Sequence, residues 1–276
     1  AAINDFKAAL SKEPSAPILS FNLSIAFHRM DSLYLALDFV NKALEKDSSK
    51  AEFFLHKGIL LSQMEQNEAA RENYFKAIEL APDMPIIYNN MGNVYSQENN
   101  IEKAQELYQK AAELFPDFLE KRYFTINETR SSGQADLVGG CQDPLVLAQD
   151  YARIYSNLGQ IYLRQGKLNE AIKAFNRAAD LDPHFPDNYN NLAACYQMAG
   201  QEAAAREYIA LAHWTYAKNY FLLDSLDAAT RAVSSALQFN PNLAEAHALR
   251  GLIYENQGQI NKARESFERA LQQKNP

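Results

Sequence analysis

Apolar residues recur along the chain at the spacing of helices that bury one face. Three stretches share the order aromatic, two residues, apolar, small, two residues, aromatic, and they run over 88–95, 155–162 and 189–196. Residues three and four apart meet on one face of a helix, and the central glycine or alanine lets a neighbouring helix approach closely. A second amphipathic segment follows each stretch, so the pattern predicts pairs of helices.

The helix pairs return with a fixed period. Gly58 and Gly92 lie 34 residues apart, and Pro82 and Pro116 have the same separation. This order resembles the tetratricopeptide repeat family, whose signature is W-x2-L-G-x2-Y, then A-x3-F, then P, at that period. The resemblance is carried by several windows, one of which contains Phe54, Gly58, Leu61, Ala70, Tyr74 and Pro82.

The resemblance implies an all-α fold, a right-handed superhelical solenoid of antiparallel helix pairs. We expect three repeats over 17–118 (17–50, 51–84, 85–118) and four repeats over 152–276 (152–185, 186–209, 210–243, 244–276). Residues 1–16 look like the second helix of a truncated repeat. Because the chain starts inside a repeat and stops where another would begin, we expect it to be a fragment of a longer protein.

Residues 119–151 depart from the repeat and are expected to form a divergent one with an irregular loop over 131–144. The shared face of Leu119, Tyr123 and Ile126 predicts a helix from Asp117 to about Thr129. Asp143-Pro144 is a good helix start, and the helix after it would extend for about 20 residues into the next window. The loop is either a tolerated insertion or a functional segment.

A second departure lies around 201–223. The windows that start at 186 and 210 are 24 residues apart, and no glycine or proline occurs between Gln201 and Leu223. This predicts that the second helix of one repeat runs directly into the first helix of the next, over about 33 Å at 1.5 Å per residue. The alternative is that a loop is missing from the sequence.

Composition and charge narrow the function classes. Of the 276 residues 47% are hydrophobic, and the net charge of −7 is dispersed, which argues against a nucleic-acid binder. Two cysteines, Cys141 and Cys195, can form neither a disulfide framework nor a four-ligand zinc site. No apolar run is long enough to span a membrane. The compartment stays open, with a preference for the cytoplasm.

The motifs of common enzyme classes are missing from the sequence. There is no glycine-rich phosphate loop, no H-E-x-x-H and no G-x-S-x-G, and the five histidines are scattered without metal-ligand spacing. We therefore expect no enzyme, no catalytic residue, no metal and no cofactor in this chain.

The candidate binding residues follow from the resemblance, which implies that the first helix of each repeat lines a concave, peptide-binding face. The sixth residue of successive windows is Asn22, His56, Asn90, Asn157, Asn191 and Thr215, before Leu249 breaks the series. An asparagine amide pairs with both groups of an extended backbone. We predict a partner-binding row of these side chains up to Asn191, flanked by Asn89, Asn93, Gln160 and Asn190.

This row resembles the asparagine ladder of certain peptide-binding solenoids, including the repeat region of O-linked N-acetylglucosamine transferases. The alternative is that the amides are merely tolerated in solvent. Towards the N-terminus Phe21, Ile25, Leu55 and Ile59 occupy matching slots, which predicts an apolar part of the face or a packed surface. A carboxylate clamp of lysine and arginine is disfavoured, because its slots hold asparagine, serine and apolar residues.

The predicted function is a protein–protein interaction scaffold or adaptor that binds a peptide or protein segment. One alternative is the substrate-selecting or targeting region of a larger, glycosyltransferase-like enzyme. Another is a structural subunit of a multiprotein assembly that associates through the ends of its array. In each case the partner is protein rather than nucleic acid.

Overall fold

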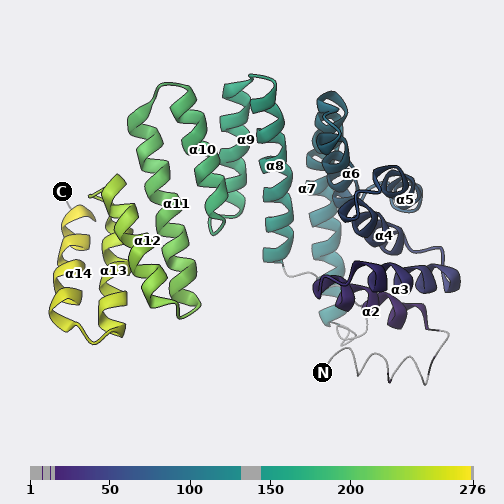
Figure 1. Cartoon of the computed structure of the whole chain (residues 1–276), viewed down its shortest axis with the longest axis horizontal. Helices are drawn as coiled ribbons and strands as arrows, with labels where there is room; N and C mark the ends of the chain where they lie inside the picture. Colours follow the sequence, from purple (N-terminus) through teal and green to yellow (C-terminus); the bar gives the residue numbers. More distant parts are fainter. Residues whose placement is uncertain (1–7, 9–12, 14–15, 132–143, 275–276) are drawn as a thin grey trace. The chain divides into compact units, whose positions relative to one another are not determined.

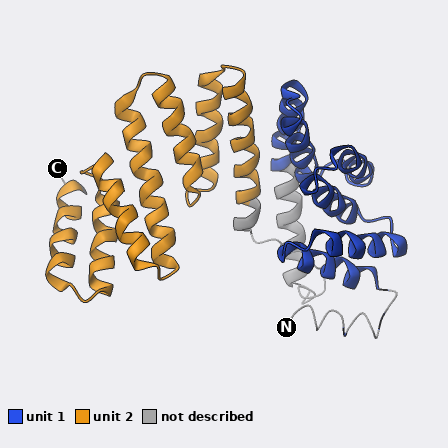
Figure 2. Ribbon diagram, viewed as in Figure 1, with its two compact units in different colours: residues 1–143 blue, residues 144–276 orange. Residues whose placement is uncertain are grey.

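The chain forms two compact units, residues 1–143 and residues 144–276 (Figure 2). The computed structural model describes residues 16–131 and 144–274 together with Ala8 and Glu13, and only the backbone of 117–131, 144–147 and Lys274. The predicted helix of residues 1–16 and the predicted loop over 131–144 therefore lie almost entirely outside the described residues.

The first unit is built from antiparallel helix pairs (Figure 1). Its helices are α2 (Pro17–Arg29), α3 (Leu33–Lys46), α4 (Ala51–Gln63), α5 (Asn67–Leu80), α6 (Pro85–Gln97) and α7 (Ile101–Ser131). The pairs α2–α3, α4–α5 and α6–α7 make the most extensive contacts. These are the three pairs that the repeat windows over 17–118 predict.

The second unit continues the same construction. Its helices are α8 (Pro144–Arg164), α9 (Leu168–Leu181), α10 (Pro186–Met198), α11 (Glu202–Leu222), α12 (Leu226–Phe239), α13 (Ala244–Asn256) and α14 (Ile260–Lys274). Every regular element of the described residues is a helix, and consecutive helices pack as pairs. The predicted all-α fold of helix pairs is confirmed.

Small residues of the first helices face large residues of the second helices sixteen positions later. A Cβ built on Gly58, Gly92, Gly159 or Gly251 would lie 2.5–2.7 Å from a ring carbon of Tyr74, Tyr108, Phe175 or Phe267, respectively. In the other repeats the small residue is serine or alanine, and the residue sixteen positions later is a smaller valine or isoleucine. The two positions therefore share one packing volume, filled either by an aromatic ring or by two medium side chains.

The predicted helix break at Pro116 is wrong. Instead of a new helix starting at Asp117, α7 runs unbroken through Pro116 to Ser131. At Pro82 the chain does form a turn between two helices. Pro85, three residues later, keeps Met84 extended and is the first residue of α6. No proline stands three residues after Pro116, where Leu119 follows instead, and the next residues include the strong helix formers Leu119, Glu120 and Lys121.

The other two helix predictions are confirmed. Helix α8 begins at Pro144 and extends for 21 residues into the following repeat. Helix α11 is a single helix of 21 residues over Glu202–Leu222, without an interruption between the repeats on either side. It packs on α10 and on α12, so it is the second helix of one pair and the first helix of the next.

Candidate partner-binding face

The asparagines predicted to bind a partner in the first unit lie on its first helices. We use the term Asn row for Asn22, Asn90, Asn157 and Asn191. Asn22 on α2 and Asn90 on α6 are both half-buried. Because they occupy the same position of their repeats, their side chains leave equivalent sides of the two helices.

His56, which holds the equivalent position on α4, lies differently. It is only 8% exposed, and its ring packs at 5.5 Å from Phe21 and 5.2 Å from His28, centroid to centroid. Burial first and the charge of His28 second lower its pKa to about 4, while a backbone hydrogen bond at Ser24 opposes the shift. His56 is therefore neutral at ordinary pH, and its ring forms part of the α2–α4 contact.

The flanking amides of α6 also divide into surface and core. Asn89 is 4% exposed and belongs to the interior. Asn93 is half-buried and accepts a hydrogen bond of 2.7 Å from the Tyr108 hydroxyl on α7. This bond fixes the orientation of the Asn93 amide, with its oxygen directed towards α7.

In the second unit Asn157 on α8 and Asn191 on α10 are half-buried, like Asn22 and Asn90. Gln160 and Asn190 beside them are exposed. The Asn190 side chain is hydrogen-bonded to the Tyr216 hydroxyl, which also donates to Asp187 at 2.9 Å. The repeat pattern does not predict this contact between α10 and α11, because it joins residues of different repeats.

The Asn row ends at Asn191. The next sixth-position residue, Thr215 on α11, is fully buried and donates to the carbonyl of Leu211 on its own helix at 2.9 Å. Leu249 on α13 is 6% exposed. Neither side chain offers a polar group to the surface, so the repeats after α10 cannot extend the row.

Four apolar side chains accompany the row on α2 and α4. Phe21, Ile25, Leu55 and Ile59 are half-buried, and Phe21 also packs on Phe53 with ring centroids 4.5 Å apart. Phe21 is thus shared between the surface and the α2–α4 core. The face of the first unit combines amide groups on α2 and α6 with apolar surface on α2 and α4.

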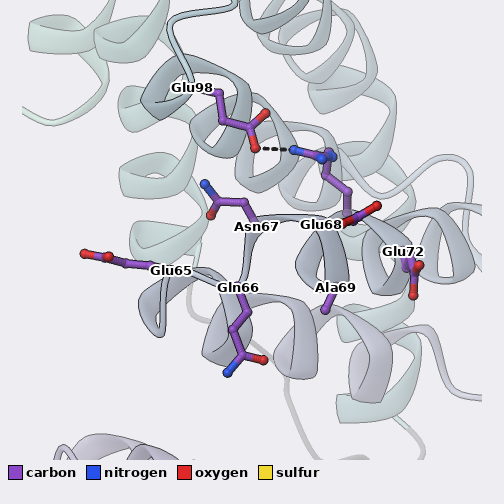
Figure 3. A pocket seen from close by; sticks show the side chains of 8 residues that line it. Glu65, Gln66, Asn67, Glu68, Ala69, Glu72 and Glu98 are labelled. Carbon is purple, nitrogen blue, oxygen red and sulfur yellow. Dashed lines mark hydrogen bonds and ion pairs between the residues drawn. The ribbon is translucent and has the colours of Figure 1, made fainter.

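An open, acidic hollow lies at the turn between α4 and α5 (Figure 3). Its walls include Glu65, Glu68, Glu72 and Glu98, and Arg71 is its one basic residue. Arg71 pairs with Glu98 at the end of α6 and lies over the Tyr95 ring at 5.5 Å. The hollow therefore lies where two consecutive repeats meet, and the Arg71–Glu98 ion pair connects these two repeats.

Replacing Arg71 by alanine is expected to lower the free energy of unfolding by less than about 1 kcal/mol, because a partly exposed ion pair contributes little. Chemical denaturation of the wild type and the variant measures the difference. A loss several times larger would show that Arg71 holds the two repeats together mainly through the Tyr95 ring.

The described residues contain no group of three or more histidine, cysteine or acidic side chains placed to hold a metal ion. In that part of the chain no helix has the length and hydropathy needed to cross a membrane. Cys195 is buried, and burial raises the pKa of its thiol to about 11. The candidate face described above consists of amide and apolar side chains.

Family models describe the same repeats. One model described as tetratricopeptide repeat matches residues 85–118 and, a second time, residues 152–185. Another model with the same description matches residues 244–275. A model described as TPR repeat matches 61–99, and another tetratricopeptide repeat model matches 174–207. Together these matches span more than half of the chain. No curated protein matches it significantly.

Several solved structures share the fold. The chain is similar to pilF of Pseudomonas aeruginosa, with a TM-score of 0.56, 17% identity, and coverage of 90% of this chain and 99% of the other. It is similar to PilW, a type IV pilus biogenesis factor (TM-score 0.50, 17% identity, coverage 91% and 90%). It also resembles MamA of Desulfovibrio magneticus RS-1, with a TM-score of 0.50, 18% identity, and coverage of 71% of this chain and 92% of the other. At these identities the likeness concerns the fold alone.

Proposed function

Because this chain belongs to the tetratricopeptide repeat family, we propose that it is an interaction scaffold, each of whose two units holds an extended segment of a partner protein through its own two asparagines of the Asn row. Proteins with this repeat fold are generally non-enzymatic scaffolds. The observation that carries the proposal is the common state of the four asparagines. Each stands at the sixth position of a first helix and is half-buried, neither in the core nor fully exposed.

The chemistry of the row favours the backbone of a partner over its side chains. An amide donates from nitrogen and accepts at oxygen, so it satisfies both the C=O and the N–H of one extended residue. The exposed neighbours Gln160 and Asn190 are also uncharged amides. A partner segment would therefore be chosen chiefly for being extended, and in the first unit for carrying an apolar side chain next to Phe21, Ile25, Leu55 and Ile59.

Replacing Asn157 and Asn191 together by alanine is expected to weaken partner binding by about 5- to 150-fold. Each lost contact contributes roughly 0.5–1.5 kcal/mol net, and 1.4 kcal/mol corresponds to a factor of ten. Quantitative affinity capture from native extract, followed by titration of the captured partner, measures the change. Circular dichroism checks that the helices persist.

The matched control replaces Asn169 and Asn261, two exposed asparagines on the second helices α9 and α14. Their removal deletes the same chemistry from another surface and should leave binding unchanged. Equal capture by wild type and by the Asn157→Ala/Asn191→Ala variant would refute backbone recognition through the Asn row.

A further inference from the structure

The single helix α11 reverses the direction of the repeats that follow it. Consecutive helices of the second unit are antiparallel, so α8 and α10, the first helices of their pairs, run the same way. One helix stands where the repeat normally has two, and therefore α11 and α13 run opposite to α8 and α10 (Figure 1). The last two pairs thus enter the array with their first helices inverted.

This reversal moves the first-helix face to the other side of the unit. A helix pair is chiral, so its first helix can be inverted along a continuing array only by turning the pair half-way round the direction of stacking. Helix α11 contacts the helix pairs on both sides of the reversal. It packs on α10 through the turns near Tyr208, whose ring stacks on Tyr196, and on α12 through Ala217, which belongs to one core cluster with Val233. The first helices after α10 hence face away from the Asn157 and Asn191 side.

The reversed side has its own chemistry, and we name it the second face. It comprises Leu211, Trp214, Lys218 and Leu222 on α11 and Leu252 on α13. Trp214, Lys218 and Leu252 hold the fifth and ninth positions, which flank the Asn row in the earlier repeats. Leu222 is 72% exposed and Leu252 is 42% exposed, while Trp214 is half-buried against the core of α11–α13. No amide row accompanies them, because Thr215 and Leu249 are buried.

Leu222 and Leu252 belong to one surface. In the first unit the sixth residue of a repeat, His56, contacts the fifth and twelfth residues of the preceding one, Phe21 and His28. Leu252 is the ninth residue of its repeat, almost one helical turn further on, so the same offset between first helices would bring it level with the thirteenth residue of the preceding repeat, Leu222. Helices α11 and α13 are indeed in contact.

Charge indicates what this surface accepts. The Lys218 ammonium lies 5.7 Å from the centre of the Trp214 ring and 3.2 Å from Nδ1 of His184. Among the described residues it has no carboxylate partner. Glu245 and Glu255 stand near the two ends of α13 and disfavour a strongly acidic ligand. The complement is an apolar segment with a single carboxylate.

We propose that the second face binds a leucine-rich segment of a partner protein carrying one carboxylate, separately from the Asn row and on the opposite side of the second unit. Leucine side chains pack on Leu222, Leu252 and Trp214, and the carboxylate pairs with Lys218. The scaffold then holds two different segments at once, one by its backbone and one by its side chains.

The experiment uses the whole chain and a short synthetic leucine-rich peptide with one aspartate. Trp214 is the only tryptophan, so its emission reports on this face directly. We expect a saturable change in the emission of Trp214, and binding roughly tenfold weaker in Leu222→Ser/Leu252→Ser, because apolar anchors dominate such contacts. Both leucines are exposed, so the variant is expected to fold, and circular dichroism verifies this.

Two comparisons distinguish peptide binding at the second face from binding at the Asn row and from non-specific hydrophobic binding. Lys218→Gln should weaken binding of the peptide that carries aspartate, but not binding of a peptide with asparagine in place of that aspartate. Asn157→Ala/Asn191→Ala should bind the peptide as the wild type does. The proposal is overturned by an emission that does not change, by binding that survives both leucine substitutions, or by loss of binding in the asparagine variant. The Asn-row proposal is tested by its own variants and stands or falls independently.

Discussion

Replacing Phe175 by alanine is expected to lower the free energy of unfolding of the second unit by about 3–5 kcal/mol, the usual cost of removing a large aromatic side chain from a core. Phe175 is fully buried, and its ring lies on Gly159. Glycine leaves no Cβ to fill the space, so the cavity has full size. Urea denaturation, with hydrogen exchange on α8 and α9 to locate the loss, measures the effect.

The reverse change at the same contact tests the shared packing volume. A Cβ on residue 159 would lie 2.6 Å from one ring carbon of Phe175, so Gly159→Ala should cost about 1–3 kcal/mol through overpacking. The double variant Gly159→Ala/Phe175→Val reproduces the pair formed by Ala217 and Val233, and it should be more stable than the sum of the two single losses.

Ala193→Gly is the control for this cycle, because Ala193 meets the smaller Ile209 at the equivalent positions. It should cost only about 1 kcal/mol, the difference in helix propensity. Strict additivity of Gly159→Ala and Phe175→Val would contradict a shared volume.

The first unit should lose roughly 3 kcal/mol of stability between pH 7 and pH 4 through His56 alone. Its pKa is about 4 in the folded chain against an ordinary 6.5, and each unit of difference corresponds to about 1.4 kcal/mol. Because the folded pKa is the lower one, the unfolded chain binds more protons in this window. The stabilisation is complete above pH 6.5 and disappears as the pH falls towards 4.

Comparison with His56→Leu isolates this contribution, since leucine keeps an apolar side chain in the α2–α4 contact and cannot titrate. Burial also lowers the pKa of His213 and of His247 in the second unit, so the whole chain has a wider pH response. Hydrogen exchange on α2 and α4 as a function of pH assigns the loss to the first unit. An identical pH dependence in wild type and His56→Leu would refute the prediction.

The neutral state of His56 also bears on the face beside it. Its ring touches Phe21, which is one of the apolar residues proposed to contact a partner. Protonation would place a charge in that contact, next to the ring of His28. Binding that depends on Phe21 should therefore weaken in the same pH window as the stability of the first unit.

The helix pairs, their period and the fused helix α11 could be predicted from the amino-acid pattern alone. These features depend on local information: the spacing of apolar residues, the prolines that start α6 and α10, and the absence of glycine and proline between Gln201 and Leu223. The Asn row could be located because an identical position returns in each repeat. Pro116 misled the prediction, because its effect depends on whether the following residues start a new helix.

The packing of the helices against one another determines which of the matching positions reach the surface and on which side. His56 and Asn89 hold predicted binding positions, yet neighbouring helices bury both, and Asn190 is engaged by Tyr216 from the next helix. The single helix at 201–223 was predicted together with a change of the superhelix direction there, but the pattern did not predict which side chains after it reach the surface. The solvent exposure of a side chain, and the side of the unit on which it lies, depend on contacts between residues far apart in the chain. The repeat pattern is local and does not contain these contacts.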